Sequence, residues 1–108
     1  MVSTVIIFEI LKIHLNHLFT SGLPQILPSN DEFVKVKSGE NLTLKCDVTG
    51  FPQSRIYWTL ESHKILDDES HFEMTDCSVR NSGVYICNAQ NDIGIAQKVY
   101  YVTVTGLL

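Results

Sequence analysis

Four histidines, three cysteines and an acidic run are the side chains of this sequence whose types could support metal or redox chemistry. A zinc site needs about four convergent ligands. Beyond residue 30 only His63, His71 and nearby acids could supply them, and they lack metal-like spacing. The run Asp67-Asp68-Glu69 lacks the alternating ligands and the glycine of a calcium-binding loop. We therefore interpret these residues as solvated loops and turns, and we expect no metal and no cofactor.

Catalytic arrangements are also missing from the sequence. It contains no hydrolase triad, phosphate-binding glycine loop, catalytic cysteine arrangement or paired-carboxylate site, so we expect that the chain is not an enzyme. Its 108 residues suffice for one domain. The net charge of −4 leaves no basic patch for nucleic acid and no attraction to an anionic membrane surface. The expected partner is therefore a protein.

Residues 1–22 are mostly apolar and end in small side chains, which is typical of a secretory signal peptide. Cleavage after Thr20-Ser21-Gly22 would leave Leu23 as the first mature residue. However, no basic residue precedes the apolar run, and Glu9 and Lys12 interrupt it, so a non-native N-terminus is the alternative. A transmembrane helix fits worse, because the uncharged run is far shorter than about 20 residues. We expect no membrane span in this chain.

Alternation of apolar and polar residues predicts an all-β domain over residues 31–105, preceded by an extended segment at 23–30 that leads into the first strand. The clearest alternation covers residues 41–48, where Leu44 and Cys46 share the buried face and Lys45 points outward. The turn at 91–94 is expected to use Gly94 at positive φ. The other expected strands are 33–37, 56–60, 84–89 and 96–105.

The most specific pattern in the sequence consists of Cys46, Trp58 and Cys87, with a tyrosine two residues before the second of these cysteines. Together with the surrounding residues, they give residues 31–105 a sequence that resembles an intermediate-set immunoglobulin domain. The matching residues are Gly39, Glu40, residues 42–46, Trp58, Phe72, Met74, Cys77, residues 81–87, Ala89, Asn91 and Gly94.

The resemblance implies an immunoglobulin-like Greek-key β-sandwich with one inter-sheet disulfide between Cys46 and Cys87. Trp58 would pack on the disulfide, with Tyr85 and Leu44 in the same core. A bond that closes a loop of about 41 residues contributes roughly 4 kcal/mol in the chain-entropy model and implies an oxidising compartment.

The third cysteine, Cys77, occupies a position where the family places a buried aliphatic side chain. We therefore expect an inert core residue there. The alternative for Cys77 is an intermolecular disulfide, which the odd number of cysteines permits.

Two departures from the family pattern have structural consequences. Asn81 stands where the family usually has an aspartate that pairs with a basic residue near strand D, so the ion pair is lost and some hydrogen bonding remains. The stretch between Trp58 and Cys87 is also shorter than usual. The segment 64–70 is therefore expected to form little or no strand C′ and a very short strand D.

Asn41-Leu42-Thr43 is the only N-glycosylation sequon, and Asn41 should face outward at the start of strand B. Combined with the disulfide framework and the N-terminal segment, the sequon favours a secreted glycoprotein or the extracellular face of the cell surface.

The outer face of the C–F–G sheet is the candidate interface, because its side chains are more apolar and aromatic than a solvated face needs. The candidates are Tyr57, Thr59, Val84, Ile86 and one of Tyr100 and Tyr101, with Tyr101 preferred. We therefore expect an extracellular recognition or cell-adhesion module that binds a homophilic or heterophilic protein partner. The alternatives are a receptor ectodomain fragment, for instance of a receptor tyrosine kinase, and an intracellular titin-like structural domain.

Overall fold

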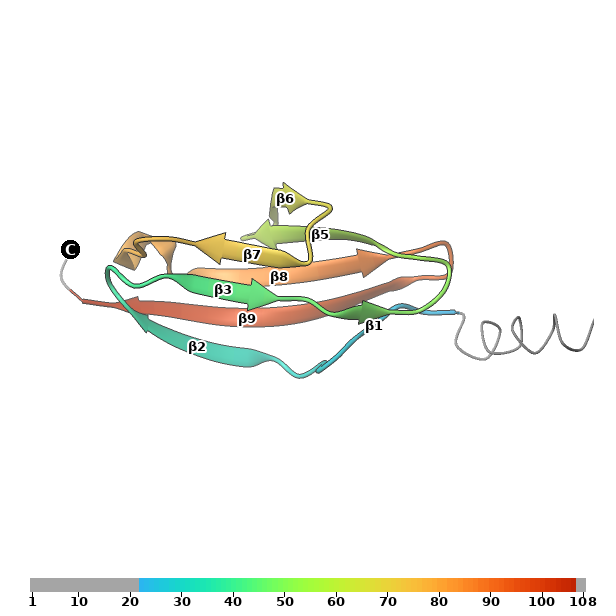
Figure 1. The fold of residues 1–108 in the computed structure, drawn as a ribbon, viewed down its shortest axis with the longest axis horizontal. Helices are drawn as coiled ribbons and strands as arrows, with labels where there is room; N and C mark the ends of the chain where they lie inside the picture. The colour runs from blue at the N-terminus through green and yellow to red at the C-terminus, as the bar shows by residue number, and fades with distance from the viewer. Residues whose placement is uncertain (1–21, 107–108) are drawn as a thin grey trace, which may run out of the picture.

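The computed structural model describes residues 22–106, which form two packed layers of β-strands (Figure 1). One layer is a five-stranded sheet in the order β2-β9-β8-β5-β6. Its strands are β2 (Glu32–Lys37), β5 (Arg55–Leu60), β6 (His63–Asp67), β8 (Gly83–Gln90) and β9 (Ile95–Thr105). The proposed signal peptide lies outside the described residues apart from Gly22.

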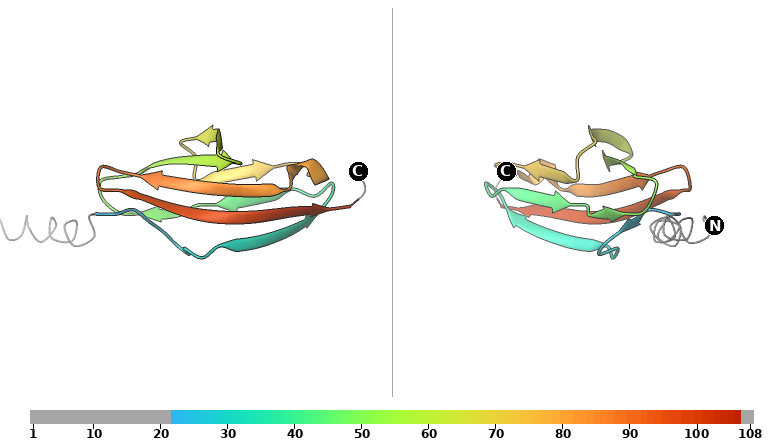
Figure 2. Two further views of the ribbon diagram at one scale, coloured as in Figure 1. Left: turned by 180° about the vertical axis from the view of Figure 1, so that it is seen from behind. Right: turned by 45° about the vertical axis from the view of Figure 1, so that its right-hand side comes forward.

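The opposite layer consists of two antiparallel pairs, β3 with β7 and β1 with β4 (Figure 2). Its strands are β1 (Gln25–Ile26), β3 (Leu42–Lys45), β4 (Val48–Thr49) and β7 (His71–Met74), and a single 3₁₀ turn covers Val79–Asn81. Two β-layers joined by an inter-sheet disulfide confirm the predicted fold class, an immunoglobulin-like β-sandwich.

The strand predicted at residues 41–48 keeps its alternation but is divided into β3 and β4. Leu44 and Cys46 face the core and are buried, while Lys45 is exposed. The ladder breaks at Cys46, whose backbone N–H donates to the carbonyl of Ser70 at 2.8 Å. The first part of this stretch, β3, therefore pairs with β7, and the second part, β4, pairs with β1.

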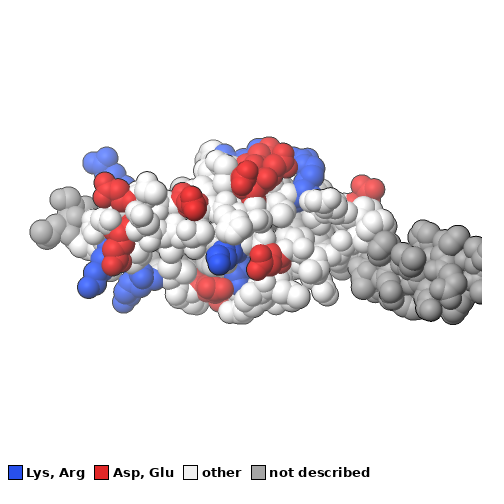
Figure 3. All heavy atoms as spheres, in the orientation of Figure 1, with Lys and Arg blue, Asp and Glu red and all other residues white. Residues whose placement is uncertain are grey.

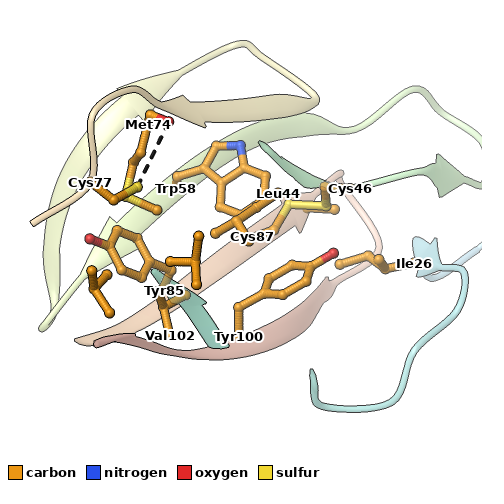
Figure 4. Close-up of a cluster of buried hydrophobic side chains, with 13 residues drawn as sticks. Ile26, Leu44, Cys46, Trp58, Met74, Cys77, Tyr85, Cys87, Tyr100 and Val102 are labelled. Atoms are coloured by element: carbon orange, nitrogen blue, oxygen red, sulfur yellow. Dashed lines mark hydrogen bonds between the residues drawn. A yellow bond between two sulfur atoms is a disulfide. The ribbon is translucent and has the colours of Figure 1, made fainter. Parts of the chain in front are cut away.

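The core is built around the Cys46–Cys87 disulfide and Trp58 (Figure 4). Trp58 is completely buried, and its ring centroid lies 5.9 Å from that of Phe72 and 6.1 Å from that of Tyr100. The indole Nε1–H donates to the backbone carbonyl of Glu69 at 2.9 Å. The large aromatic surface is therefore buried without leaving its one polar atom unsatisfied.

Tyr85 forms the corner that precedes the second cysteine. Its hydroxyl donates to the carbonyl of Asn81 at 2.6 Å. The Asn81 side chain in turn accepts from the backbone N–H of Ser78 at 2.7 Å. Asparagine thus keeps hydrogen bonds at the corner. The free cysteine, Cys77, is buried nearby with 1% of its surface exposed.

Lys98 is a buried cation that the sequence patterns did not reveal. It lies on the inward face of β9 with 1% of its surface exposed, and its Nζ is 2.7 Å from a Glu32 carboxylate oxygen. The same Nζ donates to the carbonyls of Pro28 at 2.8 Å and Asn30 at 3.1 Å, and lies 5.2 Å from the Tyr100 ring centroid. Lys98 therefore fastens the segment between β1 and β2 to the sheet.

The prediction of little or no strand C′ is wrong. β6 pairs with β5 over most of its length, so strand C′ is present. A tight turn through Glu61 and Ser62, both at positive φ, uses so few residues that the short stretch still accommodates a hairpin. Asp68, Glu69 and Ser70 then lead directly into β7, which leaves no strand D between β6 and β7.

The turn at 91–94 is present, but the expected positive φ at Gly94 is wrong. The turn is held instead by Asn91, whose Oδ1 accepts from the N–H groups of Ile93 at 2.8 Å and Gly94 at 3.1 Å. A Cβ at residue 94 would lie 2.3 Å from Leu23 Cδ2, so the exposed Leu23 side chain would have to shift to accommodate it.

We predict that Lys98→Met destabilises the domain by about 2 kcal/mol, because the carbonyls of Pro28 and Asn30 lose a charged donor. Lys35→Met, on the exposed face of β2, should change the free energy of unfolding by less than about 0.5 kcal/mol. Urea unfolding of the oxidised proteins measures both. A Lys98→Met variant as stable as the parent would show that the buried cation contributes no net stability.

Burial raises the pKa of Tyr85 and of Tyr100 above the ordinary value of 10.0. A raised folded-state pKa means that the neutral phenols stabilise the fold below about pH 10, and that this stability is lost as the pH rises through the folded-state values. Urea unfolding at a series of alkaline pH values should show this loss. The double variant Tyr85→Phe, Tyr100→Phe should lose less stability between neutral and alkaline pH. An unchanged pH dependence in that variant would contradict the assignment.

Candidate functional site

Three of the candidate interface residues lie together in a hollow on the outer face of the five-stranded sheet. Thr59 pairs with Ile86, and Tyr57 pairs with Asn88, so these side chains project from neighbouring strands on the same face. The hollow has a volume of about 520 Å³. Its full lining is Arg55, Tyr57, Thr59, Ser62, Lys64, Ile86, Asn88, Gln90 and Gln97.

Asn88 forms part of this hollow and is buried, although its side chain is on the outward-facing side of the sheet. It lies on the outer face of β8 but is only 3% exposed. Its Nδ2 donates to the carbonyls of Tyr57 at 3.2 Å and Ile86 at 3.3 Å, and its Oδ1 accepts from Gln97 Nε2 at 2.7 Å. A satisfied amide network of this kind holds the Asn88 and Gln97 side chains in place in the lining of the hollow.

The rim of the hollow carries two cations that share one carboxylate. Asp67 lies 3.0 Å from Lys64 Nζ and 3.8 Å from Arg55 Nη2. Lys64 Nζ also lies 5.9 Å from the centroid of the Tyr57 ring. All three charged side chains are exposed, so the ion pairs contribute little to stability. Their effect is to place a charged rim beside an aromatic and apolar surface.

Val84 and Tyr101 do not line the hollow. They are cross-strand partners on β8 and β9, and Tyr101 stacks on Phe33 of β2 with 4.7 Å between ring centroids. The candidate residues therefore fall into two groups on the same face. Tyr100, the other tyrosine considered, is buried in the core.

Phe33 was missed as an interface candidate, although it is 81% exposed. The alternation of β2 contained the signal, since Val34 and Val36 turn toward the core and Phe33 must then face outward. Phe33 and Tyr101 therefore form an aromatic pair on the outer face of the sheet.

Asn41 is exposed immediately before β3, in the layer opposite the hollow. Its Oδ1 accepts from the backbone N–H of Asp76 at 2.9 Å. Thr43 of the same sequon is also exposed. A glycan on Asn41 would therefore leave the outer face of the five-stranded sheet uncovered.

Within residues 22–106 no cluster of histidine, cysteine and acidic side chains is arranged to hold a metal ion. The same residues contain no helix long and apolar enough to cross a membrane. The chemistry available at the hollow is hydrogen bonding, apolar contact and ion pairing, which together suit the recognition of another molecule.

Comparison with known proteins agrees with this architecture. A family model described as an immunoglobulin domain matches residues 24–91. Immunoglobulin superfamily member 10 of Homo sapiens is 30% identical over 103 residues, which cover 87% of this chain and 4% of the relative. The cell adhesion molecule DSCAM of Gallus gallus is 31% identical over 104 residues, which cover 82% of this chain and 5% of the relative.

The solved complex of titin M10 with an obscurin-like 1 immunoglobulin domain is also similar. It has a TM-score of 0.68 and 26% identity, and the match covers 79% of this chain and 96% of the solved chain. The family and its adhesion-molecule relatives support the prediction that this chain is not an enzyme. The chain spans 4–5% of the length of the two curated relatives. It belongs to the immunoglobulin domain family.

Proposed function

We propose that this chain is an extracellular recognition module that binds a protein partner through the outer face of its five-stranded sheet. The hollow around Tyr57, Thr59 and Ile86 carries the proposal, because it combines one aromatic and one apolar side chain with amide groups and a charged rim. Interfaces of protein complexes have this arrangement, with aromatic anchors in the centre and polar groups at the edge.

Two features support an extracellular location. The Cys46–Cys87 disulfide suits an oxidising compartment, and the Asn41 sequon is exposed away from the proposed interface. Relatives that include a cell adhesion molecule agree with an adhesive or receptor role, including that of an ectodomain fragment of a larger protein.

A structural domain inside the cell is the second candidate function. The similarity to a titin domain supports it. In that setting Cys46 and Cys87 would remain reduced and Asn41 would carry no glycan. The two candidates therefore differ in the covalent state of the protein as well as in its location.

We predict that Ile86→Asp weakens partner binding or self-association about 30-fold or more, because it places a charge in the centre of the hollow. Ile93→Asp is the matched control, since Ile93 is exposed in the turn between β8 and β9 and does not line the hollow. Bead aggregation measures self-association, and a panel of purified ectodomains measures binding to other proteins. Equal binding by the two variants would exclude this face as the interface. If Ile86→Asp unfolds, Tyr57→Ala provides the same test, because Tyr57 lines the hollow from the neighbouring strand β5.

The location is tested by the intact mass of the full chain expressed in a secreting eukaryotic cell. We expect recovery from the medium without residues 1–22, with the mass lowered by two hydrogens for one disulfide and raised by a glycan. Thr43→Ala should remove the glycan and leave the rest unchanged, since it destroys only the sequon. Retention in the lysate at the full reduced mass would favour the intracellular structural role.

A further inference from the structure

The absence of strand D leaves one edge of β7 open. β7 pairs with β3 on one side, and among residues 22–106 no strand pairs with its other side. No backbone–backbone hydrogen bond connects His71–Met74 to a loop at that edge either. An edge of this kind presents unpaired N–H and C=O groups to which a further strand can add.

The edge is held open by the connection that precedes it. The backbone of this connection is fixed at three successive residues. Asp68 N–H donates to the carbonyl of Ile56 at 2.7 Å, and the carbonyls of Glu69 and Ser70 accept from Trp58 Nε1 and the Cys46 N–H, respectively. The connection is therefore tied to the core instead of lying along the edge of β7. β7 is thus preorganised to receive a partner strand.

A hollow of about 620 Å³ lies beside this edge, lined by Leu66, Glu69, His71 and Glu73. Leu66 and Phe72 pack against the core but remain partly exposed, as apolar side chains do when a covering strand is missing. Acidic side chains gather over β6 and its connection to β7 (Figure 3). The described residues provide no ion-pair partner for Glu69 or Glu73.

We propose that the open edge of β7 binds an extended segment of a protein partner in which apolar and basic side chains alternate. The segment adds to β7 as a strand, with its backbone paired to the open edge. Its apolar side chains cover Leu66 and Phe72, and its basic side chains face Glu69 and Glu73. The two sets alternate because successive residues of a strand point to opposite faces.

The charge at the edge favours this partner over a second copy of the chain. Two β7 edges brought together would place the carboxylates of Glu69 and Glu73 from both copies on one shared edge, and like charges across a strand pair are destabilising. The site is separate from the outer face of the five-stranded sheet and does not rest on the function proposed for that face.

The test titrates the full oxidised chain with the blocked peptide Val-Lys-Val-Lys-Val-Lys and, in parallel, with Val-Glu-Val-Glu-Val-Glu. We expect only the basic peptide to bind and to slow hydrogen exchange at amides of β7. The double variant Glu69→Gln, Glu73→Gln should weaken binding about tenfold, because it removes two exposed ion pairs. The control Asp31→Asn, Asp92→Asn removes the same charge elsewhere on the surface and should leave the affinity within about twofold.

Three results would overturn the proposal. The first is equal binding of the two peptides or of the two double variants. The second is protection from exchange that appears outside β7. The third is self-association of the peptide-free chain with β7 protected, measured by sedimentation and exchange, which would show that a second copy occupies the edge. The substitutions leave in place the backbone carbonyl of Glu69, which accepts a hydrogen bond from the Trp58 indole. Trp58 fluorescence should therefore match that of the parent protein in each folded variant.

Discussion

The contact of Trp58 with the Cys46–Cys87 disulfide is the interaction on which the rest of this structure depends. The disulfide joins the two layers, and the indole fills the space beside it. Because Trp58 points inward from β5, its neighbours Tyr57 and Thr59 must point outward into the hollow. The same indole holds the connection that ends at the open edge of β7. Both proposed binding surfaces therefore depend on one buried ring.

Much of the fold follows from local patterns in the sequence. Alternation around Leu44 and Cys46 predicts which residues are buried, because one face of each strand must pack on the opposite layer. The spacing of Cys46, Trp58 and Cys87 resembles that of immunoglobulin domains, and this resemblance implies the sandwich and the disulfide that the structure contains. Three of the residues proposed for the interface line one hollow because the register of β5 and β8 carries them there.

The features that the sequence did not predict depend on contacts between distant segments or on the number of residues in a turn. Lysine is ordinarily a surface residue, and the burial of Lys98 is explained by the Glu32 carboxylate and the carbonyls of Pro28 and Asn30 around its Nζ. Strand C′ was missed because chain length alone does not reveal how few residues a tight turn needs. Gly94 was expected to adopt a positive φ, whereas the turn is held by the Asn91 side chain and Gly94 lies close to Leu23, far away in the chain. Local periodicity contains none of this information.

The buried thiol of Cys77 has a consequence for the order of events during folding. In the unfolded chain Cys77 is separated from Cys87 by 10 positions (77 to 87), whereas Cys46 is separated from Cys87 by 41. Loop-closure entropy alone therefore favours the wrong pair by about eightfold. If the domain folds before oxidation, burial of Cys77 prevents this wrong pair, whereas oxidation before folding leaves the pair to be corrected by thiol–disulfide exchange. Packing of the strand that carries Met74 and its neighbours thus favours the native bond over its shorter competitor.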